Sequence, residues 1–266
     1  MHTPLVSVVI ESIYKNKSGA TVMLPDYMAK ATPDMAGAIY ALASEVASLG
    51  GKLVLSDLFR SHDMQLQAHL DYINGKKKAY SPPPGGSFHE AGRAMDIELG
   101  KTGMPLANFW SLAKKYNIVP IISSPDMHKN EAWHFECRGS HQTVINYYQN
   151  KFGNNFPDPY MAGAASAILA ANIPVDFFGG QQKEAQLQAL LIRLGENIGN
   201  IDGIIGGKTQ AVLTGLKLNG ASLSDTLNAV ENLAQQTFPE EYSTLYPTQP
   251  QPLFFDSKIP QHLSWQ

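Results

Sequence analysis

The chain has 266 residues, enough for one large domain or for two smaller domains that each bury a core. Hydrophobic residues make up 44% and charged residues 16%, the composition of an ordinary globular protein. A net charge of −3 gives no indication of binding to nucleic acid or to an anionic membrane, and the single cysteine, Cys137, excludes an internal disulfide framework.

Targeting signals are not evident in the sequence. Residues 1–10 contain no basic region, no long apolar core and no small-residue cleavage site, so no signal peptide is predicted. The most apolar run, 160–171, is well short of the ~20 residues that a bilayer-spanning helix needs. We therefore expect synthesis in the cytoplasm and no membrane span.

The first long element is a helix that follows a short β-rich run at 5–10. Thr32 is expected to cap this helix with its hydroxyl, and Pro33 suits its first position. Apolar residues at helical spacing predict a buried stripe that ends at Gly50-Gly51: Met35, Ile39, Leu42, Val46 and Leu49.

Next along the chain, residues 52–59 are expected to form a strand that delivers Arg60 at its end. Residues 65–73 then predict a helix, stopped by Asn74-Gly75. A lysine triplet at 76–78 is expected to be solvated. It leads into a loop rich in proline and glycine that ends at Gly86.

From Arg93 to Leu99 the residues alternate in character. Met95, Ile97 and Leu99 form one apolar face, so the pattern predicts a strand that points Asp96, on the other face, towards a cleft. Gly92, just before it, is expected to let the backbone pass close to a bound metal.

Helices at 104–117 and 143–151 and strands at 118–122 and 131–137 complete the first half of the chain. Strands separated by helices, with hairpin-like returns, predict a compact α+β domain.

The second half predicts helices. Residues 161–171 indicate a connecting helix. Leu187, Leu190, Leu191 and Leu194 then form an apolar helix face, and 200–209 is a glycine-punctuated turn with Thr209 as the expected cap of the next helix. A third helix is predicted at 222–235.

Two short motifs supply the residues of a catalytic zinc site. The stretch Ser87-Phe-His-Glu-Ala-Gly-Arg-Ala-Met-Asp96 contributes His89 and Asp96, and Glu131-Ala-Trp-His134 contributes a second histidine and a spare carboxylate. A catalytic zinc ion uses three protein ligands and leaves one position for water. We predict that His89, Asp96 and His134 bind Zn²⁺ and that Glu131 is the general base.

Ser-x-His-x-x-x-x-x-x-Asp followed by Glu-x-Trp-His resembles the zinc D-alanyl-D-alanine carboxypeptidases and related peptidoglycan peptidases of the VanY type. Residues 55–65 also resemble that family's strand ending in Arg-Ser-x-x-x-Gln. The resemblance covers about residues 30–150. It implies an α+β zinc peptidase domain with a small antiparallel sheet and flanking helices.

The resemblance also implies roles for residues around the metal. Arg60 is expected to stabilise the developing oxyanion. Ser87, Gln65 and Trp133 form the predicted substrate-binding group: Ser87 hydrogen-bonds substrate, Gln65 buttresses the arginine loop, and Trp133 is a wall beside the metal. Glu136 is a candidate for orienting a ligand histidine, and its alternative is a structural role.

Residues 181–236 resemble the small three-helix peptidoglycan-binding domain, through the leucine helix and the turn Asp202-Gly-x-x-Gly-x-x-Thr209. We therefore predict a zinc metallopeptidase domain at 1–155, a linker with a short helix at 156–180, an all-α domain at 181–236 and a C-terminal extension at 237–266.

The function predicted from these resemblances is zinc-dependent hydrolysis of a peptide bond in the peptidoglycan stem. A lytic endopeptidase is favoured, as in a phage endolysin or a secreted antibacterial effector, and a D-Ala-D-Ala carboxypeptidase of wall remodelling is the alternative. The partner is peptidoglycan, met in the periplasm or cell wall, and the lysine triplet has an anionic wall polymer as its alternative contact. An immunity protein and a secretion machinery are further candidate partners.

Two rival readings stay open. A non-catalytic wall-binding protein would hold a structural metal with four closed protein ligands, whereas the motifs supply three and a spare Glu131. A zinc amidase or a dipeptidase that acts outside the wall is the other rival. An amidase would release amino-sugar ends instead of new stem-peptide amino groups.

Overall fold

The computed structural model describes residues 2–243 and has the predicted α+β character. Residues 244–266, with most of the predicted C-terminal extension and its Phe254-Phe255 pair, lie outside the described residues. Within the described part, no helix is long and apolar enough to cross a membrane.

A six-stranded sheet forms the centre of the first half. The structure orders its strands as β3 (Thr21–Met23), β2 (Glu11–Lys15), β5 (Leu55–Asp57), β6 (Ala94–Ile97), β8 (His134–Glu136) and β7 (Val119–Pro120). The β2–β5 pair is parallel and the other pairs are antiparallel, so the sheet is mixed where an antiparallel one was expected. A separate two-stranded ladder joins β1 (Val6–Ser7) to β4 (Lys30–Ala31).

Helices cover this sheet and also form a second, helical body. The first half contributes α1 (Pro33–Ser48), α2 (His62–Ile73) and α3 (Leu106–Lys114), with the 3₁₀ turns η1 (Phe88–Ala91) and η2 (Leu99–Lys101). The second half contributes α4 (His141–Gln149), α5 (Pro159–Ala170), η3 (Asp176–Phe178), α6 (Gln182–Arg193), α7 (Gly207–Gly215), α8 (Leu223–Thr237) and α9 (Pro239–Tyr242).

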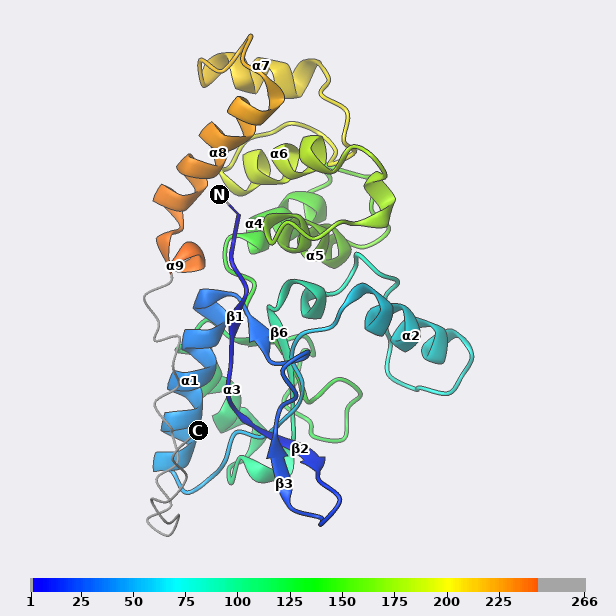
Figure 1. The fold of residues 1–266 in the computed structure, drawn as a ribbon, viewed down its shortest axis with the longest axis vertical. Helices are drawn as coiled ribbons and strands as arrows, with labels where there is room; N and C mark the ends of the chain where they lie inside the picture. Colours follow the sequence, from blue (N-terminus) through cyan, green and yellow to red (C-terminus); the bar gives the residue numbers. More distant parts are fainter. Residues whose placement is uncertain (1, 244–266) are drawn as a thin grey trace, which may run out of the picture.

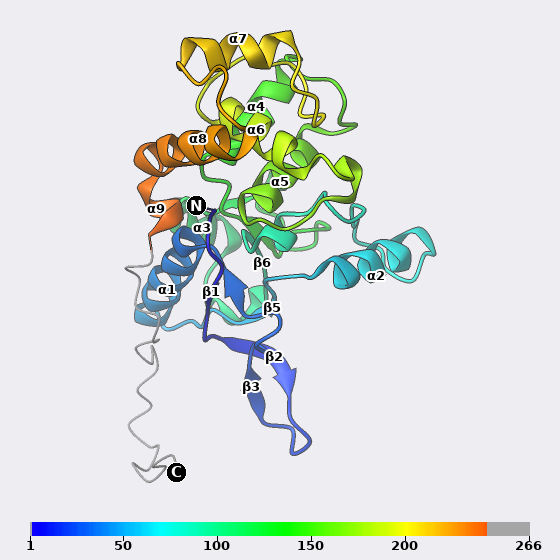
Figure 2. The same cartoon turned by 45° about the horizontal axis from the view of Figure 1, so that its top comes forward.

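Two apolar cores correspond to these two bodies. One is built from α1, α3 and the sheet, and the other from α4, α5, α6 and α8 together with η1. In two views the helices α4–α8 gather at one end of the molecule, the β2–β3 hairpin lies at the other, and α2 projects to one side (Figures 1 and 2). The predicted closing helix α4 shares its core with α5 and α6, while the domain boundaries themselves stay a prediction.

The start and end of α1 differ from expectation in detail. Pro33 does occupy the first turn, but the Thr32 hydroxyl donates to the Asp34 carboxylate at 2.7 Å instead of capping a backbone N–H. The buried stripe runs through Val46, whereas Leu49 is 61% exposed because it is already the C-cap residue.

Strands are shorter than the alternation predicted. β6 is buried at all four positions, including Asp96, because β5 and β8 flank it and η1 covers it. Leu99 lies outside the strand, in η2. Likewise β5 ends at Asp57, so that Arg60 sits three residues beyond the strand.

Glycine 92 lies against residues 5, 30 and 31. It adopts φ +64°, and a Cβ there would meet Leu5 Cδ2 at 2.9 Å and Ala31 Cα at 3.0 Å. Its lack of a side chain therefore admits the close approach of residues 5, 30 and 31, and the expectation that it lets the backbone pass close to a metal stays a prediction.

In the helical body, α6 is the central element. Residues from Ala185 to Arg193 are all buried, not only the predicted leucine face, because α4, α5 and α8 surround the helix. Thr209 is also not a cap: Gly206 takes that position, and Thr209 is buried inside α7.

Candidate metal site and substrate cavity

The pairing of β6 with β8 brings two of the predicted metal ligands face to face. Asp96 is the register partner of His134, and η1 places His89 beside them. Ligand atoms of His89, Asp96 and His134 all lie within 4.8 Å of one another, and all three side chains are buried. Three motif residues separated by up to 45 positions thus form one cluster.

His89 is oriented for ligation. Its Nδ1–H donates to the Leu58 carbonyl at 2.8 Å, which fixes the ring and leaves Nε2 as the acceptor nitrogen. Nε2 is buried without a hydrogen-bond partner and lies 3.3 Å from Asp96 Oδ1. A buried, unpartnered lone pair is costly unless something binds it.

His134 is held from the opposite side. Its Nε2 lies 3.2 Å from Glu136 Oε1, and its Nδ1 lies 2.9 Å from Asp96 Oδ1. Arg138 then fixes Glu136 through a 2.6 Å ion pair. The predicted contact between Glu136 and a candidate ligand histidine is therefore present, and Arg138 in turn contacts Glu136.

Arg60 contacts the remaining oxygen of the metal-ligand carboxylate. Nη2 donates to Asp96 Oδ2 at 3.3 Å, Nε donates to Asp57 Oδ2 at 2.6 Å, and Nη1 donates to Gln65 Oε1 at 3.2 Å. Three of the five N–H groups of a guanidinium are thereby used, leaving two for another acceptor. Arg60 also lines the cavity.

The pKa values of the cluster show that its surroundings favour positive charge on the histidines and negative charge on Asp96. Burial alone would raise the pKa of Asp96, but the imidazoles of His89 and His134 outweigh it and hold that pKa well below its usual value. Burial would lower the pKa of His134, whereas Asp96 and Glu136 raise it to about 10. A proton or a metal cation satisfies the same surroundings.

Glu131 precedes β8 in a turn and is not part of the strand predicted at 131–137. It adopts φ 68°, a left-handed conformation that costs a non-glycine residue about 1–2 kcal/mol. Its Oε1 is buried without a partner, and burial is the main reason that its pKa is raised. Such strain is concentrated at functional sites.

The donor set fits a divalent metal ion. Two imidazoles and one carboxylate are a common ligand set for zinc, and one imidazole nitrogen has no other partner. Among residues that line the cavity, two are cationic (Arg60, Lys77) and four are anionic (Asp96, Glu131, Glu136, Asp158), so the lining as a whole is acidic.

The other predicted site residues separate into two groups. Ser87 and Trp133 line the cavity with Arg60, Glu131 and the three candidate ligands. Gln65 is fully buried behind Arg60, and its amide donates to Ser81 Oγ at 3.1 Å and to the Pro82 carbonyl at 2.7 Å. The structure thus places Gln65 as a support for Arg60 and away from the cavity surface.

Ser87 also has a local structural task. Its hydroxyl accepts from His89 N, while the Glu90 carboxylate accepts from Ser87 N and Gly85 N, which completes a capping box. Burial raises the pKa of Glu90 to about 7. The spacing Ser87-x-x-Glu90 could have revealed this pair in the sequence.

Two tyrosines and two charged residues also line the cavity, and of these four the sequence singled out only Lys77, as part of the lysine triplet. Lys77 and Tyr80 come from the loop after α2, and Asp158 and Tyr160 come from the start of α5. No local motif marks Tyr80, Asp158 or Tyr160, because packing between distant elements brings them to the site.

The histidines without a motif lie elsewhere. His62 contacts Asp176, His69 contacts the Ser81 carbonyl, His141 contacts Ser166, and His128 is exposed and does not line the cavity. Cys137 is buried, and burial raises the pKa of its thiol well above the usual value.

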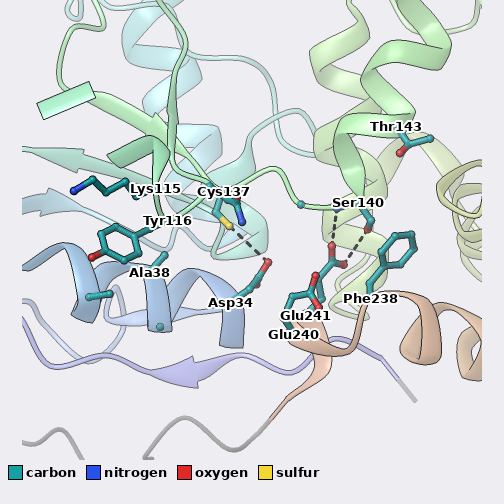
Figure 3. A pocket seen from close by; sticks show the side chains of 14 residues that line it. Asp34, Ala38, Lys115, Tyr116, Cys137, Ser140, Thr143, Phe238, Glu240 and Glu241 are labelled. Atoms are coloured by element: carbon teal, nitrogen blue, oxygen red, sulfur yellow. Dashed lines mark hydrogen bonds between the residues drawn. The ribbon is translucent and has the colours of Figure 1, made fainter. Parts of the chain in front are cut away.

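A second hollow lies between α1, the turn before α4, and α9 (Figure 3). Cys137 Sγ faces Asp34 there at 3.6 Å, and Glu241 accepts from Ser140 N at 2.6 Å and from Ser140 Oγ at 3.0 Å. Glu241 also pairs with the buried Arg193 at 2.7 Å. These contacts tie α9 to α4 and α6, and both Asp34 and Glu241 have an arginine partner.

No protein-family model and no curated protein matches the chain. One solved structure with some likeness is described as "Structure of the LdcB LD-carboxypeptidase reveals the molecular basis of peptidoglycan recognition". It is 22% identical over 50% of this chain and 66% of that chain, with a TM-score of 0.38. The chain therefore matches a little under two thirds of that protein's length, and so loose a superposition identifies neither a shared fold nor a shared activity.

Proposed function

We propose that the protein is a zinc-dependent peptidase that hydrolyses a peptide bond in the peptidoglycan stem. The observation that carries the proposal is the convergence of His89, Asp96 and His134 with an unpartnered carboxylate, Glu131, in one cavity. The resemblance of these motifs to VanY-type peptidases supplies the substrate class.

In this proposal His89 Nε2, an Asp96 oxygen and His134 Nδ1 bind the metal. A zinc ion supplies a Lewis acid that polarises the scissile carbonyl and lowers the pKa of water. Leu58, Glu136 and Arg60 keep the three ligands in place through the hydrogen bonds described above.

The proton transfers belong to Glu131. Its carboxylate accepts the proton of the attacking water and then passes it to the leaving amine. The free N–H groups of Arg60 donate to the oxygen of the carbonyl as negative charge develops there, an interaction worth about 3–4 kcal/mol in other hydrolases. Trp133 forms a wall of the cavity and Ser87 is a polar contact for substrate.

The proposed role of the helical body is to hold the enzyme on its polymer. The resemblance of 181–236 to a peptidoglycan-binding domain supports this role, since a tethered enzyme meets its substrate at a higher local concentration. Under this proposal the protein acts in the periplasm or cell wall. An immunity protein and a secretion machinery remain candidate partners.

The choice of bond divides the proposal in two. The wall-binding resemblance favours a lytic endopeptidase. One observation favours the D-Ala-D-Ala carboxypeptidase: Lys77 lines the cavity and has no ion pair with another residue of 2–243, so it is available to a terminal carboxylate.

Mass spectrometry of muropeptides tests the proposal. Purified wall is incubated with the zinc-loaded protein and, in parallel, with Glu131→Gln. Release of whole stem fragments supports the endopeptidase, and loss of one terminal alanine supports the carboxypeptidase. New amino-sugar ends would indicate an amidase instead, and wall that is bound but uncut by both proteins would leave a non-catalytic binding protein.

A further inference from the structure

One rim of the cavity carries two exposed tyrosines beside a carboxylate. Tyr80 is 54% exposed and Tyr160 is 37% exposed, and both line the cavity that contains the metal cluster. Asp158, the N-cap residue of α5, lines the same cavity and is also exposed. The rim therefore combines aromatic faces and an anion in one place.

Asp158 has one oxygen free for a ligand. Its Oδ1 accepts the Tyr160 backbone N–H at 2.7 Å, and the carboxylate forms no ion pair with another residue of the described chain. The carboxylate also lies close to Tyr80: burial, and then the charge of Asp158, raise the pKa of the Tyr80 hydroxyl. An unpaired charge at a cavity rim can pair with a substrate.

The cation that stacks on Tyr160 is already paired with another carboxylate. The Arg138 guanidinium stacks on the Tyr160 ring at 4.8 Å, but its charge is already paired with Glu136 at 2.6 Å. Lys77, the other cation of the wall without an internal partner, forms no ion pair with Asp158 either. Asp158 and Lys77 are thus charges of opposite sign on the cavity wall, and neither forms an ion pair within residues 2–243.

Carboxylates and aromatic faces together favour an organic cation. A substrate ammonium gains a charge-assisted hydrogen bond from Asp158 and a cation–π interaction from a tyrosine ring. We propose that Asp158, Tyr80 and Tyr160 form a subsite for a substrate ammonium group. This inference rests on the proposed function. In a stem peptide, the ammonium group is the free side-chain amine of the diamino acid.

An ammonium subsite distinguishes stems with a free side-chain amine from stems whose amine is acylated. A cross-linked stem has its side-chain amine acylated and so carries no positive charge at that point. The subsite therefore selects stems whose diamino acid is uncross-linked. It also gives the stretch 156–180, predicted as a linker, a direct contact with substrate.

The test measures binding and cleavage of two synthetic stem pentapeptides that carry lysine at the third position, one with a free side-chain amine and one Nε-acetylated. Calorimetry uses the zinc-loaded full chain with Glu131→Gln, so that the peptide is not consumed. Asp158→Asn is added to this background because asparagine caps a helix as well as aspartate and only the charge is lost. Asp126→Asn, at an exposed aspartate outside the cavity, is the matched control.

We expect acetylation to weaken binding about tenfold in the Glu131→Gln protein and in the Asp126→Asn control, as for the loss of roughly 1.4 kcal/mol. In Asp158→Asn the two peptides bind equally. The subsite is contradicted if the Glu131→Gln protein binds both peptides equally, or if it binds neither. It is also contradicted if the preference for the free amine persists in the Asp158→Asn variant.

Cleavage by the unmodified protein separates this inference from the proposed function. A tenfold preference in binding that depends on Asp158, without cleavage of either peptide, supports the subsite and contradicts the peptidase. Cleavage of both peptides with equal affinity contradicts the subsite and leaves the peptidase intact.

Discussion

Two buried polar clusters lie at opposite ends of the same strand pair, and they differ in completeness. At one end, Asp96 and His134 meet His89 in an open cavity, where His89 Nε2 and Glu131 Oε1 have no partner. At the other end, Arg93 pairs with Asp34 beside Cys137, and the neighbouring Arg193 pairs with Glu241.

The closed cluster is a structural unit in which each carboxylate has a guanidinium partner. The open cluster leaves its demand for charge and hydrogen bonds unmet, which is how a site for a metal and a substrate differs from a structural ion pair. The comparison predicts that changes at the open cluster alter chemistry, and changes at the closed cluster alter stability.

The largest expected effect is at the unpartnered carboxylate. Glu131→Gln keeps the size of the side chain but cannot accept a proton, so kcat should fall about 10²–10⁴-fold. Zinc affinity and the urea midpoint should stay unchanged. Steady-state assays on a stem peptide measure the loss, with the exposed Glu98→Gln as matched control. Activity near that of the control would remove Glu131 from the mechanism.

The closed cluster gives the opposite result. Arg193→Met leaves Glu241 buried without a cation, which should lower the free energy of unfolding by about 3–5 kcal/mol. The paired change Arg193→Met with Glu241→Leu should recover most of that loss, because no lone charge remains. Urea unfolding measures both variants. Additive losses in the double variant would show that the two charges do not act as a pair.

A smaller effect is expected one step behind the metal ligands. Glu136→Gln removes the charge that Arg138 and His134 share, so zinc affinity should fall about 10–100-fold. Competition with a zinc-binding dye measures it, and the exposed Glu240→Gln serves as control. An unchanged affinity would mean that the His134 ring is held without Glu136.

The smallest effect concerns an exposed contact between α2 and η3. Hydrogen bonds from the His62 ring to the carboxylates of Asp176 and then of Asp63 raise the pKa of His62 above 6.5. A raised folded-state pKa means that the stabilisation is full below pH 6.5 and is lost as the pH rises through the higher value. Because the side chain is 41% exposed, we expect only a few tenths of a kcal/mol.

Thermal unfolding between pH 5.5 and 8.5 checks this contact. His62→Gln should flatten the pH dependence relative to the exposed His128→Gln. A stability difference that grows with rising pH would have the wrong sign for this pair.

The sequence was most informative where function is encoded locally. His89, Asp96 and His134 were predicted together from two short motifs and a family resemblance, and they form one cluster because β6 pairs with β8 and η1 packs on β6. The role of Glu131 stays a prediction. The α+β class and the positions of most helices followed from apolar periodicity, because that pattern is also local in the sequence.

Features that depend on distant packing were missed. Asp158 and Tyr160 reach the cavity only because α5 packs on η1 and α4, a contact with no local signature. Similarly, the burial of all sides of α6 and the need for glycine at position 92 arise from neighbours far away in the sequence. The parallel β2–β5 pair has the same origin, since local alternation does not encode strand order.

The most direct test of the central claim is an anomalous-difference map at the zinc edge, from crystals of the zinc-loaded protein. The account predicts one strong peak bound by His89 Nε2, Asp96 and His134 Nδ1, with no fourth protein ligand. A peak closed by a fourth side chain, such as Glu131, or no peak at this cluster would contradict a catalytic metal site.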